Sequence, residues 1–473
     1  MGSAVAFAGA PTAAGSSAVA RFACRATAFA GAALLVLSAA SPALAVAPPD
    51  VLVGTVPPDG PPGPELPTKQ DKGCQTAGVL PNSDLVQVPP PERALELRQA
   101  RALTRGAGVT VAVLDTGVSP DTRLPNLIGG GDYVQAGGDG LYDCDAHGTL
   151  VAGIIGGAAD PADGFTGVAP DARIVSIRYR SGAFSLDNPP QNFDAVQQAS
   201  LDVRTMARAI THAANLGAGV ITVSVPICLP VSTQVDQSML SQAIGYAVHV
   251  RGALIVAGAG NTGGSGCGQN PAIDPSRPFD PRNWDAVKTI ATPSWYSTDV
   301  LTVGFTTAAG ETMDDSLTGP WVSVGAPGTG IESLGPGGPS LINGVGAGDK
   351  LVPVGGASFA AAYVSGVAAL LRSRFPNETP AEITARLVAG AHAPARGVDN
   401  TVGAGVIDAL ESLSYRTPPK PPADTARGAM LVMPPPRRPV DWRPRTVVGI
   451  VFGVVILFWP VSAGLRAVFR RKP

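Results

Sequence analysis

Apolar positions in the middle of the chain form short runs, with longer amphipathic stretches between them. The runs that predict strands are residues 109–114, 173–179, 220–225 and 253–257. The first run is almost continuously apolar and rich in valine, as a strand buried on both faces should be. Residues 195–216 and 238–250 lie between these runs and have the apolar spacing of helices. Strands that alternate with helices predict βαβ units, and therefore an α/β fold around a parallel sheet.

The N-terminus has the pattern of a secretory signal. Arg21 and Arg25 precede a mostly apolar run over residues 28–40, and the small residues Ala43 and Ala45 follow it. A basic region, an apolar run and a small-x-small site are the three parts of a cleavable signal peptide. Residues 1–45 are therefore predicted to be removed on export. The alternative is an uncleaved N-terminal anchor.

The C-terminus has the pattern of a membrane span. Residues 446–465 contain no charged side chain. As a helix they would extend about 30 Å, the thickness of a bilayer core. The tail at 466–473 is basic, so the positive-inside rule places it in the cytoplasm and the rest of the exported chain outside. A buried core helix is the alternative, which the terminal position and the basic tail disfavour.

Two proline-rich segments bracket the middle of the chain. Residues 46–91 hold proline pairs and a proline triplet, which exclude regular helix or sheet over most of that length. Residues 416–445 are also rich in proline and are typical of a semi-rigid linker. The folded domain is therefore predicted to span residues 92–415.

Composition and charge exclude several functional classes. The chain has 34 basic and 36 acidic residues, and its net charge of −2 disfavours binding to nucleic acid. Hydrophobic residues make up 45% of the sequence, too large a share for a wholly disordered chain. Of the five cysteines, Cys24 would leave with the signal. The other four, which allow two disulfides in three possible connectivities, are Cys74, Cys144, Cys228 and Cys267.

Three residues are candidates for catalysis, and each also has an ordinary structural role. Asp115 ends the first predicted strand, where parallel sheets form sites, but aspartates there often cap helices or turns. His147 precedes small residues typical of a tightly packed helix, and it could equally be a helix-start or core histidine. Ser358 follows two glycines at the start of a helix that is apolar nearly all round. There it is either a nucleophile or an N-cap.

The order of these residues along the chain identifies the arrangement. A serine nucleophile needs a base within reach, and the base needs an acidic partner. The order Asp115, His147, Ser358 is that of subtilisin, and it differs from the orders in chymotrypsin and the α/β-hydrolases. A fourth segment, residues 256–261, resembles the subtilisin segment that ends in the oxyanion asparagine, here Asn261. On these four segments the chain resembles the subtilisin-like serine proteases. The resemblance implies a parallel sheet with helices on both faces and an Asp-His-Ser triad.

The layout of the whole chain narrows the resemblance. A signal, a proline-rich extension, a protease domain, a proline-rich stalk, one span and a basic tail resemble the mycosins, the membrane-anchored subtilases of type VII secretion systems. Leu150, where many subtilases have a second histidine, also resembles that subfamily. The resemblance implies an extension that wraps around the domain without inhibiting it. It also implies the disulfides Cys74–Cys144 and Cys228–Cys267.

Two functions follow from this resemblance. The first is an endopeptidase held on the extracytoplasmic side of the cell membrane, where it cleaves secreted proteins beside the type VII secretion complex, without a cofactor or a metal site. The second is a mainly structural component that stabilises the complex and has weak proteolysis. Ala357, Ala362 and the segment 224–227 depart from the common subtilase pattern. Ala357 replaces a threonine whose hydroxyl supports the site, and 224–227 replaces a substrate-lining segment. These departures predict low turnover and an unusual substrate preference.

Overall fold

The structure, a computed structural model, describes residues 46–263, 267–347, 350–395, 397–415 and 419. The chain divides into two compact units, Met1–Pro419 and Lys420–Pro473, and all of the described residues lie in the first. The predicted signal at 1–45, the predicted span at 446–465 and the predicted tail lie outside the described residues. Within the described ranges, no helix is long and apolar enough to cross a membrane.

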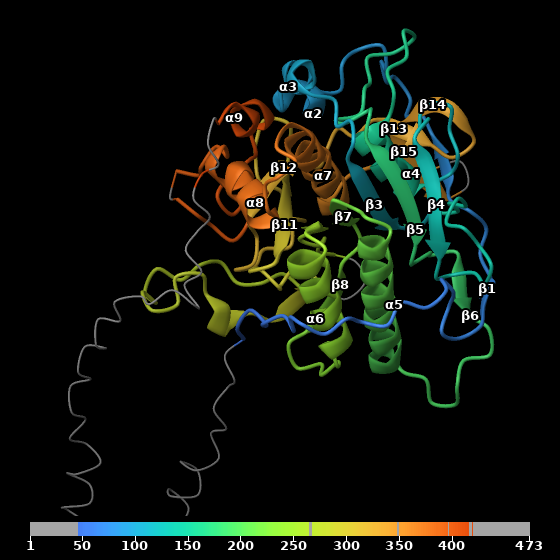
Figure 1. The fold of residues 1–473 in the computed structure, drawn as a ribbon, viewed down its shortest axis with the longest axis vertical. Helices are drawn as coiled ribbons and strands as arrows, with labels where there is room; N and C mark the ends of the chain where they lie inside the picture. The colour runs from blue at the N-terminus through green and yellow to red at the C-terminus, as the bar shows by residue number, and fades with distance from the viewer. Residues whose placement is uncertain (1–45, 264–266, 348–349, 396, 416–418, 420–473) are drawn as a thin grey trace, which may run out of the picture. The chain divides into compact units, whose positions relative to one another are not determined.

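A seven-stranded sheet forms the centre of the domain, and every neighbouring pair of its strands is parallel (Figure 1). From one edge to the other the strands are β12 (Val324–Pro327), β11 (Val300–Thr306), β9 (Leu254–Gly258), β7 (Val220–Val223), β3 (Thr110–Asp115), β5 (Arg173–Arg178) and β4 (Leu127–Asp132). The four strands predicted from apolar runs are β3, β5, β7 and β9, at the middle of this sheet. The prediction of a parallel sheet is confirmed.

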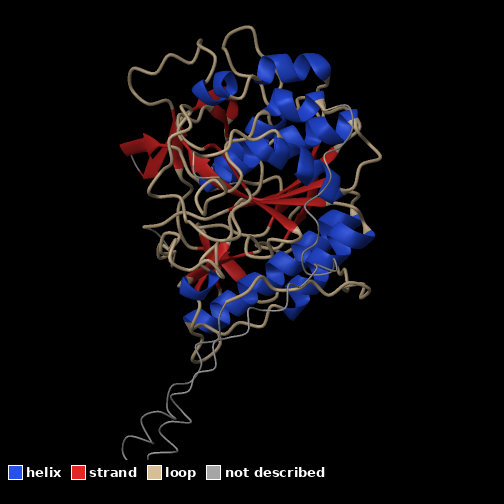
Figure 2. Cartoon of the chain, turned by 90° about the vertical axis from the view of Figure 1, so that its left-hand side faces the viewer, coloured by secondary structure: helices blue, strands red, loops and turns tan. Residues whose placement is uncertain are grey.

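Alternate residues of the central strand β3 enter two different hydrophobic cores. Val111 and Val113 belong to the core that contains residues of the helices α4 (His147–Gly156) and α7 (Ala357–Arg374). Ala112 and Leu114 belong to the core that contains residues of the helices α5 (Ala195–Asn215) and α6 (Ser238–Gly245). The strand is continuously apolar because both of its faces are buried. Figure 2 shows helices on both sides of the central strands.

The helices on the two sides of the sheet are α4 (His147–Gly156), α5 (Ala195–Asn215), α6 (Ser238–Gly245), α7 (Ala357–Arg374), α8 (Pro380–Ala389) and α9 (Ala409–Ser414). Of these, α5 and α8 start at a capping box, whereas α4, α6 and α7 have no side-chain cap. Asp194 and Gln197 form a reciprocal capping box at the start of α5, which fixes its first residue. The helix predicted over 238–250 is α6 followed by a π-helical turn, Tyr246–Val250.

The proline-rich extension lies on the surface of the domain. Its two short strands pair with distant ones: β1 (Thr68–Gln70) with β6 (Phe184–Leu186), and β2 (Thr76–Gly78) with β15 (Gly344–Ala347). The blue segment in Figure 1 runs across α6 and α5 before reaching β1. The helices α2 (Pro90–Ala94) and α3 (Leu97–Leu103) follow, and α2 crosses the predicted domain boundary at residue 92.

Smaller elements complete the domain. They are β8 (Ile227–Pro230), β10 (Thr289–Thr292), β13 (Ser333–Gly335), β14 (Gly338–Ile342), β16 (Lys350–Pro353) and the 3-10 turn Trp284–Ala286. Strands β8 and β10 pair antiparallel, and β8 continues directly from the segment 224–227. That segment therefore has a fixed backbone beside the carboxyl edge of the sheet.

Candidate active site

Two of the four predicted site residues lie at or just beyond the ends of strands of the central sheet, and the other two lie at the starts of helices. Asp115 is the last residue of β3, and Asn261 follows β9. His147 is the first residue of α4, and Ser358 is the second residue of α7. Carboxyl ends of parallel strands and the helices that follow them are where α/β proteins bind their ligands. Residues far apart in sequence thus meet at one edge.

Asp115 is a fully buried carboxylate with several hydrogen-bond donors around it. Its Oδ1 accepts from Thr116 N at 2.6 Å and lies 2.7 Å from His147 Nδ1, and its Oδ2 accepts from the Ser224 hydroxyl. Burial opposes ionisation, but the charge of His147 and the hydrogen bonds outweigh it. The pKa of Asp115 therefore lies below its ordinary value, and the side chain is ionised.

His147 is bound to this carboxylate on one side of its ring. Its side chain is 26% exposed, and its ring centroid lies 5.2 Å from that of Phe359, with the two rings tilted by 46°. Burial opposes protonation, but the charge and hydrogen bond of Asp115 raise the pKa of His147, with further contributions from Asp143 and Asp145. With Nδ1 held by Asp115, Nε2 is the nitrogen left to exchange a proton with a substrate or a nucleophile.

Ser358 lies in the same site, but its hydroxyl has another partner. Its Oγ donates to the backbone oxygen of Ser224 at 2.8 Å. No hydrogen bond joins Ser358 to His147 anywhere in the described part of the chain. The same residue, Ser224, therefore binds Asp115 through its hydroxyl and Ser358 through its carbonyl. For Ser358 to attack a substrate, its hydroxyl must leave this carbonyl and turn to His147.

Asn261 is fixed by one end of its side-chain amide. Its Oδ1 accepts from the backbone N–H of Ala357 at 2.9 Å, which leaves the Nδ2 hydrogens for another acceptor. A Cβ at Gly356 would lie 2.9 Å from Asn261 Nδ2, and Gly356 has a φ of 136°. Only glycine suits this position, because a side chain would displace the amide. The backbone before α7 thus sets the direction of the Asn261 donor.

A second buried carboxylate, Asp143, supports the site, although no role was predicted for it. Asp143 Oδ2 accepts from Thr149 N at 2.9 Å and from the Thr149 hydroxyl at 2.6 Å. Its Oδ1 accepts from the Thr116 hydroxyl at 2.9 Å, and that hydroxyl in turn accepts from Gly148 N. Burial raises the pKa of Asp143 to about 6 against these hydrogen bonds. Its position, four residues before His147 and close to the start of a helix, was the sequence feature that could have indicated this role.

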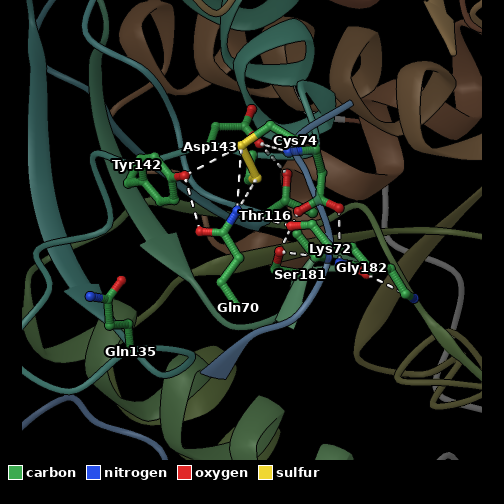
Figure 3. Close-up of a disulfide and its surroundings, with 12 residues drawn as sticks. Gln70, Lys72, Cys74, Thr116, Gln135, Tyr142, Asp143, Ser181 and Gly182 are labelled. Carbon is green, nitrogen blue, oxygen red and sulfur yellow. Dashed lines mark hydrogen bonds between the residues drawn. A yellow bond between two sulfur atoms is a disulfide. The ribbon is translucent and has the colours of Figure 1, made fainter. Parts of the chain in front are cut away.

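The two disulfides implied by the mycosin resemblance are both present in the structure. Cys74 and Cys144 are bonded at an S–S distance of 2.05 Å, and Cys228 and Cys267 at 1.96 Å. Figure 3 shows the first bridge beside Asp143 and Thr116, with Gln70 donating to both sulfurs. The extension is therefore covalently attached at the residue next to Asp143.

A hollow of about 750 Å³, which we call the catalytic groove, opens beside Ser358 and Asn261. One wall is the segment 224–227 and the start of β8, and the opposite wall is the first turns of α5. Pro226 has no N–H, and the backbone oxygen of Val225 accepts from the Tyr179 hydroxyl. This wall therefore offers a peptide fewer backbone hydrogen bonds than an open strand would. No cluster of His, Cys, Asp and Glu suited to a metal occurs among the described residues.

Comparisons with known proteins agree with this geometry. Residues 106–405 match the model of the subtilase family, peptidase S8. Mycosin-1 of Mycolicibacterium smegmatis is 46% identical over 443 residues, which cover 93% of this chain and 97% of that protein. The crystal structure of MycP1 from the ESX-1 type VII secretion system is 47% identical, covers 80% of this chain and 98% of its own, and has a TM-score of 0.76. A chain in the periplasmic assembly from the ESX-5 inner membrane complex is 46% identical, with coverages of 83% and 100% and a TM-score of 0.76.

Proposed function

This chain belongs to the subtilase family and, within it, to the mycosins, so it is a subtilisin-like serine peptidase; on that premise we propose that it cleaves polypeptides through Ser358, His147 and Asp115. The observation that carries this assignment is the bond of 2.7 Å between His147 and an ionised, buried Asp115, within the site that also holds Ser358. A histidine with a raised pKa beside a serine at a helix start is the arrangement of a base and its nucleophile.

Each residue then has one role in the reaction. The Ser358 hydroxyl gives its proton to His147 as its oxygen attacks the carbonyl carbon of the substrate. Asp115 keeps the proton on His147 Nδ1 and stabilises the imidazolium that forms. His147 passes the proton to the departing amine, and water then releases the acyl group by the reverse steps. Asn261 Nδ2 donates to the oxyanion of each tetrahedral intermediate.

Hydrolysis of denatured casein by the purified full-length protein tests this assignment. We expect slow cleavage, because Pro226 offers the substrate no donor and the Val225 carbonyl already accepts from Tyr179. Ser358→Ala should abolish the cleavage without changing the fold. Cleavage by Ser358→Ala at the wild-type rate would refute the assignment.

We also place the protein at a cell membrane, in a type VII secretion complex, with its protease domain on the extracytoplasmic side. The support is the uncharged stretch at 446–465 with its basic tail, and the relative found in the periplasmic assembly from an ESX-5 inner membrane complex. The substrates proposed are secreted proteins. The same relative favours a second function, in which the domain mainly stabilises the complex.

One comparison separates the two functions. Secretion is measured in a strain that carries Ser358→Ala and in a strain that lacks the whole protein. Equal loss of secretion in both strains would mean that proteolysis is required. Normal secretion with Ser358→Ala, and loss only on deletion, would mean that the protein acts as a scaffold.

A further inference from the structure

The catalytic groove shares lining residues with a second cavity, which the N-terminal extension helps to form. This cavity of about 580 Å³, the extension cavity, is lined by extension residues within 64–68, by residues within 184–193 and by residues of α5. Arg180, Gln198 and Asp202 line both the extension cavity and the catalytic groove. The two hollows are therefore neighbours, and an extended peptide that crosses these three residues would reach the extension cavity.

The extension is held firmly enough to serve as a wall. Thr68 pairs with Leu186 in the antiparallel ladder of β1 and β6, and its hydroxyl donates to the backbone oxygen of Val134. Glu65 forms an ion pair of 3.0 Å with Arg204 on α5. These contacts lie on both sides of Leu66, so the side chain that lines the cavity sits on a fixed backbone.

The lining of the extension cavity is partly apolar and partly polar, with Thr68, Ser185 and Gln198 among its polar members. Leu66 from the extension and Leu186 and Phe193 from the opposite segment line it. The nearby charges are already paired, since Arg180 lies 3.7 Å from Asp202 and Glu65 is paired with Arg204. An apolar side chain of an extended peptide would bury its surface against Leu66, Leu186 and Phe193 without stranding a charge.

The position of the groove indicates which part of a substrate reaches this cavity. His147 must donate its proton to the departing amine, so the part of the substrate after the scissile bond lies on the His147 side. The described residues that line the catalytic groove include Ser358 and Asn261 but not His147. The groove, and the extension cavity beyond it, therefore lie on the side of the residues that precede the scissile bond.

We infer that the N-terminal extension forms a distal substrate subsite, which takes an apolar residue several positions before the scissile bond. The inference rests on the proposed function, because it assumes that peptides bind along the catalytic groove. It gives the extension a part in substrate selection, in addition to its attachment at Cys74.

The rate at which phosphonate probes label Ser358 in the full-length protein tests this subsite. One probe is a dipeptidyl diphenyl phosphonate, and the other carries six further residues of mixed aliphatic and aromatic type before the same dipeptide. In the wild-type protein the long probe should label about tenfold faster, the gain that a small apolar pocket provides. Leu66→Asp should remove most of that gain and leave the rate with the short probe unchanged.

Two further variants control for folding and for charge. Phe193→Ala alters the opposite wall of the cavity and should also reduce the gain, which covers the case in which Leu66→Asp fails to fold. Val56→Asp adds the same charge at an exposed extension residue outside the cavity and should keep the full gain. Equal labelling by both probes in the wild type, or a full gain in Leu66→Asp and Phe193→Ala, would overturn the inference. If the short probe also fails to label the wild type, the proposed function itself is refuted.

Discussion

Replacing both Cys74 and Cys144 with alanine should lower the free energy of unfolding by about 4 kcal/mol. The bridge joins residues that are 70 positions apart, and the chain-entropy model gives about this value for such a loop. Cys144 is buried at 1% exposure, so alanine avoids placing a hydroxyl in the core. The extension should stay docked, because β1 and β2 still pair with β6 and β15.

Urea unfolding of the purified protein, with and without the two substitutions, measures this loss. Peptide mapping without reductant should first show that Cys74 is paired with Cys144 in the wild type. The matched control is the double alanine variant of Cys228 and Cys267, which are 39 positions apart. It should lose slightly less stability, because the entropy term grows only with the logarithm of loop length.

Two results would refute this reasoning. A loss below about 1 kcal/mol with an unchanged m value would show that the bridge does not restrict the unfolded chain as the model assumes. Finding Cys74 free, paired with Cys228 or Cys267, or removed by cleavage would show that the extension is not attached at Cys144.

Three further predictions concern the site and the domain. Asn261→Leu should lower kcat by roughly 10²–10³, the cost of removing the equivalent donor in a subtilisin, with little change in KM; a fall of less than about tenfold would argue against an oxyanion role. Asp143→Asn should shift the acid limb of the kcat/KM profile to lower pH, because the negative charge of Asp143 helps to raise the pKa of His147; an unchanged limb would contradict that coupling. The stability of the Asp143→Asn variant relative to the wild type should increase as the pH rises from about 4 to 6. In that range Asp143 ionises in the unfolded wild type, whereas burial keeps it largely protonated in the folded wild type, where its pKa is about 6. A fragment of residues 46–415 should fold as a soluble protein, as its circular dichroism and unfolding transition would show. If this fragment were insoluble while the full-length chain folded in detergent, the predicted domain boundary would be wrong.

The centre of the sheet could be predicted from the sequence because its strands are buried on both faces. Strands β3, β7 and β9 therefore appear as short apolar runs, and β5 appears as an alternating segment. The strand β4 could not be found in this way. Its sequence is Leu-Ile-Gly-Gly-Gly-Asp, and its edge position leaves part of it exposed. Its place in the sheet depends on pairing with β5, which a local pattern does not contain.

The candidate site was predictable in its residue types and not in its contacts. The order Asp115, His147, Ser358 is a property of the sequence. The position of the Ser358 hydroxyl depends on the backbone of Ser224, which lies 134 residues away. Asp143 is 27 residues from Thr116, and their contact forms only after α4 packs beside β3. Such contacts follow from tertiary packing, so no local sequence pattern reveals them.

The most direct test of the proposed triad is labelling of the full-length protein by a serine-directed phosphonate, followed by mass spectrometry of the modified peptide. We expect one modified residue, Ser358, and no labelling of Ser358→Ala. Labelling should also disappear in His147→Ala, because without that base the Ser358 hydroxyl is not activated. Labelling of Ser358 that persists in a folded His147→Ala variant, or labelling of another residue, would contradict the proposed triad.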